Sequence, residues 1–138
     1  MALTLSHDVW CAVTAHAEAG YPHEVVGILA GRGARATRAV PLRNENAERP
    51  ATRYRVDGLA LFRAEAALEA DGLEVLGYYH SHPDHPSAAS DEDREHALPR
   101  RSYLIVAVHD GHTHTHQSWR LRDDRSVMDE EPVTLESA

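Results

Sequence analysis

Apolar residues recur along the chain in two patterns, one typical of helices and one typical of buried strands. After Ser6, a residue type that often caps a helix, Val9 and Val13 fall on one helical face. Continuous apolar runs over residues 25–30 and 102–108 instead indicate buried strands. In chain order the predicted elements are an edge strand over 3–5, a helix over 7–19, strands over 25–30 and 36–42, a helix capped by Asp57 that runs to about 70, a strand over 73–79, a short helix that begins at 90, and strands over 102–108 and 113–122.

The order of these elements predicts an α+β fold, because it lacks the regular alternation of strand and helix that a doubly wound sheet requires. Asp110 and Gly111 are typical of a hairpin turn between the last two strands. The tail from Asp123 is acidic, and its pattern predicts no particular element. With 138 residues and no internal repeat, we expect one domain that spans residues 1–138.

Charge and hydropathy exclude several classes of partner. The formal net charge of −8 repels nucleic-acid phosphates, and no long basic run offsets it, so we expect no nucleic-acid partner. The longest apolar run, residues 25–31, is far shorter than the ~20 residues that a membrane-spanning helix needs. The first residues also lack the features of a secretory signal, so we expect a cytoplasmic protein that does not enter a membrane.

The histidine and cysteine content restricts the metal chemistry that the chain can support. The sequence has eleven histidines but one cysteine, Cys11, which excludes an intramolecular disulfide, a thiolate zinc cluster and the cysteine pair of zinc deaminases. We expect Cys11, which follows Trp10 in the first helix, to be packed rather than reactive. Any transition-metal site must therefore combine histidine with carboxylate or water.

One short stretch combines those ligands at a suitable spacing. His80 and His82 are two residues apart at the end of a strand, so their side chains point to the same face. The seven-residue loop after His82 can return the chain so that Asp93, on the first turn of the next helix, meets the same ion. Two histidines and one carboxylate leave a fourth position for water, as in catalytic zinc sites. Taken separately, the histidines are also typical of an exposed pair, and Ser90 with Asp93 is typical of a helix capping box.

The complete spacing, His-x-His-x7-Ser-x2-Asp, resembles the signature of the JAMM metalloprotease family, also called JAB or MPN-plus. The resemblance extends from the first helix to the last strand pair and includes the upstream pattern Pro-x-Glu-x-x-Gly-x-Leu-x-Gly around Glu24. Val26 and Ala89 differ from many bacterial relatives, which have cysteine and proline there. The resemblance implies a single MPN/JAB-like domain whose mixed, mostly antiparallel curved sheet is flanked by helices.

The resemblance also implies a role for each residue of the motif. His80, His82 and Asp93 would ligate Zn²⁺, Glu24 would act as the general base, and Ser90 would hydrogen-bond the carbonyl oxygen under attack. These roles suit the residue types, because a carboxylate can move a proton and a hydroxyl can stabilise developing negative charge. Iron or another divalent ion suits the same ligands.

The function implied by this resemblance is a zinc-dependent peptidase or isopeptidase. It would cleave after the C-terminal Gly-Gly of a ubiquitin-like or sulfur-carrier protein, and homodimers are common among such relatives. The alternative is a scaffold of the same fold that binds a ubiquitin-like protein without chemistry. A DNA-repair role, by analogy with RadC-type proteins, is disfavoured by the acidic charge.

Two further features suggest weaker hypotheses. His112, His114 and His116 alternate along a strand, so they would share one face and offer a second metal site, although an exposed strand face has the same pattern. His85 lies inside the motif loop and could compete for the ion. The loop over residues 44–53 borders the substrate groove in relatives, which suggests that it grips an extended peptide.

Overall fold

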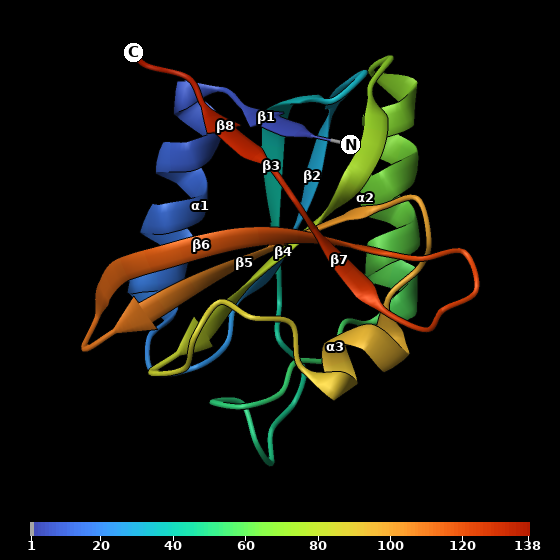
Figure 1. Ribbon diagram of the computed structural model, residues 1–138. Helices are drawn as coiled ribbons and strands as arrows, with labels where there is room; N and C mark the ends of the chain where they lie inside the picture. Colours follow the sequence, from blue (N-terminus) through green and yellow to red (C-terminus); the bar gives the residue numbers. More distant parts are fainter. Residues whose placement is uncertain (1) are drawn as a thin grey trace.

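The computed structural model describes residues 2–138 and consists of an eight-stranded sheet with three helices packed against it (Figure 1). The elements are β1 (Leu3–Leu5), α1 (His7–Gly20), β2 (Val26–Arg32), β3 (Arg35–Leu42), α2 (Gly58–Ala70), β4 (Glu74–Pro83), α3 (Asp91–His96), β5 (Ser102–His109), β6 (His112–Leu121), β7 (Met128–Glu131) and β8 (Val133–Leu135). All the helices and strands predicted from the sequence are present, with ends that differ by a few residues.

The sheet is mixed and mostly antiparallel, which confirms the predicted α+β class. Its strand order is β7-β6-β5-β4-β2-β3-β1-β8. The pairs β2–β3, β2–β4, β5–β6 and β6–β7 are antiparallel, whereas β1–β3, β1–β8 and β4–β5 are parallel. The strand β4, which carries both histidines of the motif, therefore has a bonded neighbour on each side. Its backbone is held firmly for this reason.

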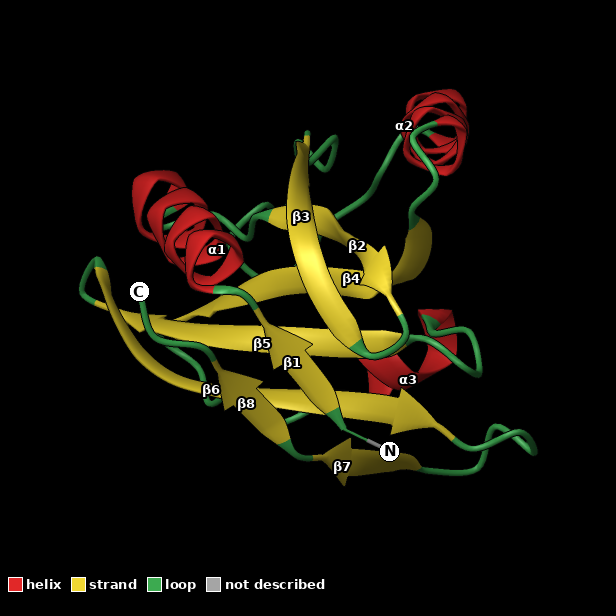
Figure 2. Cartoon of the chain, turned by 90° about the horizontal axis from the view of Figure 1, so that it is seen from above, coloured by secondary structure: helices red, strands yellow, loops and turns green. Residues whose placement is uncertain are grey.

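The helices divide between the two faces of the sheet, and Figure 2 shows α1 and α2 on opposite sides of β3. On one face α1 buries Val9, Val13 and Ala17 against the sheet, in a cluster that includes Leu104. On the other face, α2 packs Leu68 against β2, and a smaller cluster forms beside α3. Because side chains alternate along a strand, neighbouring residues of β4 face these two different layers.

Three details differ from the sequence-based expectations. The strand β4 continues to Pro83, so both motif histidines lie within it. The acidic tail forms β7 and β8, which pair with β6 and β1 and so complete both edges of the sheet. The prediction that Cys11 is packed is wrong, because it is exposed on α1 between the inward-facing positions Val9 and Val13.

No helix within residues 2–138 has the length and apolar character needed to cross a bilayer.

Candidate functional site

The central strand β4 presents both histidines of the motif to the layer that holds α2 and α3. His80 lies opposite Val26 of β2 and Ile105 of β5 in the register, and His82 lies opposite Ala107. The side chains of His80 and His82 are buried, and they share a face because one residue separates them. The predicted arrangement of the two imidazoles is confirmed.

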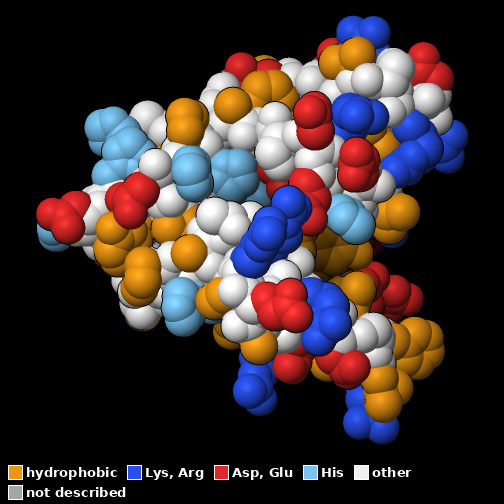
Figure 3. Space-filling model, turned by 90° about the horizontal axis from the view of Figure 1, so that it is seen from below, with side chains coloured by type: hydrophobic (Ala, Val, Ile, Leu, Met, Phe, Trp, Pro, Cys, Tyr) orange, Lys and Arg blue, Asp and Glu red, His pale blue; other side chains and the backbone are white. Residues whose placement is uncertain are grey.

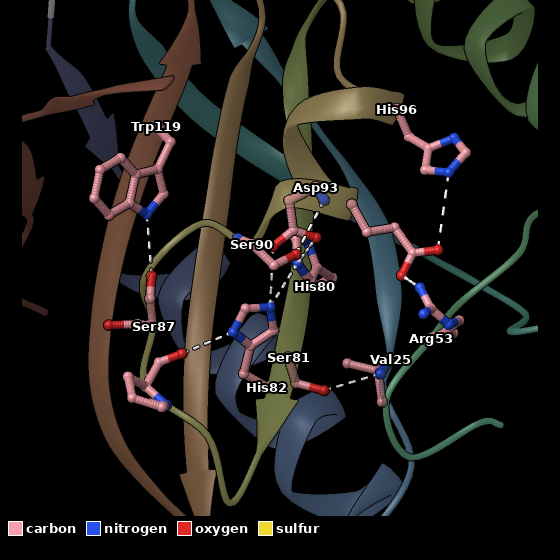
Figure 4. Close-up of polar contacts among 12 residues, drawn as sticks. Val25, Arg53, His80, Ser81, His82, Ser87, Ser90, Asp93, His96 and Trp119 are labelled. Atoms are coloured by element: carbon pink, nitrogen blue, oxygen red, sulfur yellow. Dashed lines mark hydrogen bonds and ion pairs between the residues drawn. The ribbon is translucent and has the colours of Figure 1, made fainter. Parts of the chain in front are cut away.

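The helix α3 brings the carboxylate of Asp93 to the two imidazoles (Figure 4). Ser90 caps this helix, since its Oγ accepts a hydrogen bond of 3.0 Å from the Asp93 amide, and the Ser90 amide donates one of 2.9 Å to Asp93 Oδ2. Asp93 Oδ1 lies 3.1 Å from His80 Nε2, and Asp93 Oδ2 lies 3.2 Å from His82 Nε2. The capping box and the ligand arrangement therefore coexist in the same four residues.

The loop between β4 and α3 fixes the orientation of His82. The carbonyl oxygen of Pro86 lies 2.7 Å from His82 Nδ1, so this nitrogen carries the proton and Nε2 presents its lone pair. The loop is held to β6, because buried Ser87 donates to Gln117 Oε1 at 2.9 Å and accepts at its carbonyl from Trp119 Nε1 at 3.0 Å. Figure 4 shows this bracing on the side of His82 that faces away from Arg53. The sequence motif does not include Gln117 or Trp119.

The donor atoms at this site suit a cation. His80 Nε2 and His82 Nε2 lie 3.2 Å apart, and both face the carboxylate of Asp93. Three acceptors that converge in this way repel one another unless a proton or a metal ion lies among them. Within residues 2–138, these three residues form the one group of at least three His, Cys, Asp or Glu residues whose ligand atoms all lie within 4.8 Å of one another.

The protonation of the group reflects the same crowding. Burial opposes the charged form of Asp93, but hydrogen bonds to His80 and His82 outweigh it and lower the pKa of the carboxyl. Burial lowers the pKa of His80, whereas the hydrogen bonds of His82 to Asp93 and Pro86 outweigh its burial and raise its pKa. Without a metal, a proton on the histidine pair takes the place of the cation. Two nitrogens and one carboxylate oxygen form a donor set typical of zinc.

Glu24 lies immediately before β2 and is held there by its backbone. Its amide donates to the carbonyl of Pro50 at 2.7 Å, and its carbonyl accepts from Asn44 Nδ2 at 3.0 Å. The next residue, Val25, is hydrogen-bonded to Ser81, whose Oγ accepts from the Val25 amide at 2.9 Å. Ser81 lies between the two histidines of β4, and Figure 4 shows its hydrogen bond to Val25. This hydrogen bond fixes the backbone next to Glu24 relative to the histidines.

Glu24 is buried, with 6% of the residue's surface exposed, and burial raises the pKa of its carboxyl to about 7. The charge of His82 opposes this rise in pKa, the charge of Asp93 adds to it, and the charge of Arg53 opposes it. A carboxyl with this pKa can both accept and return a proton near neutral pH.

This raised pKa predicts a pH-dependent stability of the metal-free protein. Between pH 4.5 and about 7 the folded state keeps a proton on Glu24 that the unfolded state releases, so the free energy of unfolding falls as the pH rises through this window. The loss is at most about 3 kcal/mol. In urea unfolding with chelator, Glu24→Gln should therefore have the same free energy of unfolding as the parent near pH 4.5 and a higher one at pH 8. A difference that does not change with pH would contradict the raised pKa.

A cavity of about 750 Å³ opens beside these groups. Glu24, His82, Ser90 and Asp93 line one part of it, and it continues between α2 and α3. Its remaining wall is largely apolar and aromatic, formed by Val26, Leu42, Tyr54, Val56, Leu61, Tyr78, Leu98 and Tyr103. Figure 3 looks onto this end of the molecule and shows hydrophobic side chains at the bottom of a hollow that is bordered by charged ones.

The polar loop before α2 contributes two side chains that the sequence pattern did not identify. Asn44 organises this loop, because its Oδ1 accepts from the Asn46 and Arg55 amides at 2.9 and 3.2 Å. The ring of Tyr54 then packs over His80, with centroids 5.0 Å apart, and Arg53 pairs with Glu92 of α3. This loop lines the cavity, although no periodic pattern could have placed these two side chains.

The second metal site suggested by the alternating histidines does not form. A bulge interrupts the pairing of β5 and β6, with Val106 opposite His116 but Val108 opposite Thr113, so the alternation breaks between them. His116 consequently packs against Trp10 of α1, at 4.8 Å between ring centroids, and His114 stacks on His109. The shared face expected for His112, His114 and His116 was wrong for this reason. His85 lines the cavity but does not belong to the metal group.

Comparison with known proteins agrees with this geometry. Residues 6–122 match a family described as prokaryotic homologues of the JAB domain. The CysO-cysteine peptidase of Mycobacterium tuberculosis is 36% identical over 137 residues, which cover 96% of this chain and 90% of that protein. A probable TtuB-protein conjugate cleaving protease of Thermus thermophilus is 43% identical over 87 residues, 63% of this chain and 57% of that protein. The desampylase of Haloferax volcanii is 37% identical over 122 residues, 83% of this chain and 86% of that protein.

Solved structures show the same fold. A protein from Desulfitobacterium hafniense superposes with a TM-score of 0.83 at 29% identity, and the match covers 100% of this chain and 94% of that one. A JAB1/MPN domain protein from Archaeoglobus fulgidus superposes with a TM-score of 0.62 at 15% identity, over 98% of this chain and 97% of that one. From its sequence match, its fold and its group of two histidines and an aspartate, the chain belongs to the JAB/MPN (JAMM) family, among the prokaryotic homologues of the JAB domain.

Proposed function

We propose that this protein is a zinc-dependent peptidase or isopeptidase that hydrolyses the bond after the C-terminal Gly-Gly of a ubiquitin-like or sulfur-carrier protein. The observation that carries the proposal is the placement of a buried carboxyl, Glu24, in the same cavity as the group formed by His82 and Asp93. A scaffold without chemistry has no need for a buried carboxyl at this position.

The relatives support the class of substrate. Three of them are named for cleaving such proteins or their conjugates: a CysO-cysteine peptidase, a probable TtuB-protein conjugate cleaving protease and a desampylase. A Gly-Gly tail has no side chains, so a groove can hold it in an extended form through backbone hydrogen bonds. The resemblance to these relatives also predicts a homodimer, which analytical ultracentrifugation would test.

Each residue has a role that its surroundings allow. His80, His82 and Asp93 would hold the ion, which when bound supplies Lewis acidity and makes a water molecule nucleophilic near neutral pH. Glu24 accepts a proton from the attacking water and delivers it to the leaving amine, because burial brings its pKa to about 7. The hydroxyl of Ser90 accepts a bond from the Asp93 amide, so its own hydrogen remains free to donate to the developing oxyanion.

Replacing Ser90 by alanine should lower kcat about 10²–10³-fold, since a donor to the developing oxyanion is lost. The same change removes a helix cap, which costs about 1 kcal/mol of stability. Ser90→Thr retains both the hydroxyl and the cap, so it should keep most of the activity. Rates should be compared at equal zinc content, measured by atomic emission. A Ser90→Ala protein with parental kcat and full zinc would remove Ser90 from the reaction.

The function itself is tested by the mass of an intact substrate. A bacterial ubiquitin-like sulfur carrier extended by cysteine after Gly-Gly should lose that cysteine in the presence of the enzyme and zinc, and should keep it in the presence of chelator. A parallel substrate with the carrier joined to a lysine side chain tests isopeptide cleavage. Retention of both adducts by a zinc-loaded enzyme would contradict the proposed function and favour the scaffold.

A further inference from the structure

One guanidinium in the cavity wall pairs with α3 rather than with its own loop. Arg53 lines the cavity together with Glu24 and Glu92, and its Nη1 pairs with the Glu92 carboxylate on α3 (Figure 4). The other arginine in the wall, Arg55, donates through Nη2 to the carbonyl of Glu45 at 3.4 Å and is exposed. The sequence contains no lysine, so arginines supply all of its permanent positive side-chain charge.

The position of Arg53 relates it to the leaving group of the proposed reaction. Both side chains line the same cavity, where the positive charge of Arg53 opposes the rise in the pKa of the Glu24 carboxyl. In the proposed reaction, Glu24 transfers a proton to the leaving amine. If this amine belongs to an amino acid with a free α-carboxylate, that carboxylate is only two bonds from the nitrogen and therefore reaches the same region.

The guanidinium of Arg53 can exchange Glu92 for another carboxylate partner at little cost in stability. The side chains of Arg53 and Glu92 are 41% and 37% exposed, and an ion pair at such a site contributes little to stability. Glu92 also lies 3.8 Å from His96 Nε2, so it keeps a second partner when the guanidinium leaves it. The planar fork of an arginine matches a carboxylate with two parallel hydrogen bonds.

We propose that Arg53 binds the α-carboxylate of a single amino acid attached after Gly-Gly, with this carboxylate replacing Glu92 as the partner of the guanidinium. This inference rests on the proposed function and narrows its substrate to linear adducts that end one residue beyond the scissile bond. A carrier attached to the lysine side chain of a protein presents no carboxylate at this position, so Arg53 does not favour it.

The test compares two carriers that differ in one group. Both end in Gly-Gly-Ala, one with a free carboxylate and the other with a carboxamide. The enzyme should cleave the acid with a kcat/KM about 10–100-fold above that of the amide, as expected for a charge-assisted pair of hydrogen bonds. Arg53→Gln should remove the preference, so that this variant cleaves the acid and the amide with equal kcat/KM. Arg53→Lys should recover part of it, because the charge remains but the fork is lost.

Matched variants separate this role from others. Arg55→Gln, on the same loop, should keep the full preference, and Glu92→Gln should lower KM for the acid because the competing carboxylate is gone. Equal cleavage of acid and amide by the parent would overturn the inference alone. An equal slowing of both by Arg53→Gln would also overturn it and assign Arg53 to holding the loop. If the zinc-loaded parent cleaves neither of these carriers but does cleave the lysine-linked adduct, the inference alone is overturned. Failure to cleave the lysine-linked adduct as well would overturn the proposed function itself.

Discussion

Replacement of Glu24 by glutamine should lower kcat about 10²–10⁴-fold while the protein continues to bind one zinc ion per chain. The reduction is the range that a positioned acid or base contributes, because the amide can neither accept nor return the proton. Zinc should remain bound because Glu24 is not among the three converging ligands. The measurement is the rate of cleavage after Gly-Gly, with the zinc content of the same sample determined in parallel.

Glutamine has nearly the same shape as glutamate, and the backbone of Glu24 is held by the Pro50 carbonyl and the Asn44 side chain, so the fold should tolerate the change. Glu74→Gln, at the exposed start of β4, is the control for removing one carboxylate from the chain and should have parental activity. Parental activity in Glu24→Gln would assign the proton transfer to another group. Loss of zinc from this variant would instead make Glu24 part of the metal site.

The candidate site could be predicted from the sequence because its parts are local. The spacing of His80 and His82 sets their shared face, and the capping preference of Ser90 sets the first turn on which Asp93 lies. Only Glu24 is remote in the sequence, and the resemblance to a family supplied it. In the structure, the hydrogen bond between the Val25 amide and Ser81 Oγ holds Glu24 at the cavity.

Other features depend on contacts between distant segments, which no local pattern contains. Arg53 and Tyr54 lie in an irregular loop whose path is set by hydrogen bonds to one asparagine, Asn44. The alternation over residues 112–116 predicted a shared face, but a bulge opposite Ala107 turned His116 to the other side. The acidic tail forms the strands β7 and β8 because it can pair with the otherwise unpaired edges of β6 and β1.

Removal of the metal should abolish activity and lower the melting temperature. Under the proposed function, zinc binds the folded state, where the three ligands converge. A free concentration about 1,000 times Kd would then add about 4 kcal/mol to the free energy of unfolding. For a chain of 138 residues this corresponds to a shift on the order of 10 °C. Asp93→Asn keeps the size of the side chain but removes its charge. This variant should lose most of the activity and most of the zinc-dependent rise in melting temperature. Calorimetry with chelator and with added zinc measures the shift, and cleavage assays in the same buffers measure the activity.

The arrangement of the histidines provides the control for this experiment. His114 is exposed and stacks on His109, outside the group formed by His80, His82 and Asp93, so His114→Ala should respond to zinc as the parent does. His82→Ala should not respond, because it removes the imidazole that the Pro86 carbonyl orients toward the ion. A zinc-dependent melting temperature that survives His82→Ala and disappears in His114→Ala would move the metal to β6. A parent whose rate and melting temperature ignore chelator would leave His80, His82 and Asp93 as a buried hydrogen-bonded cluster stabilised by a proton.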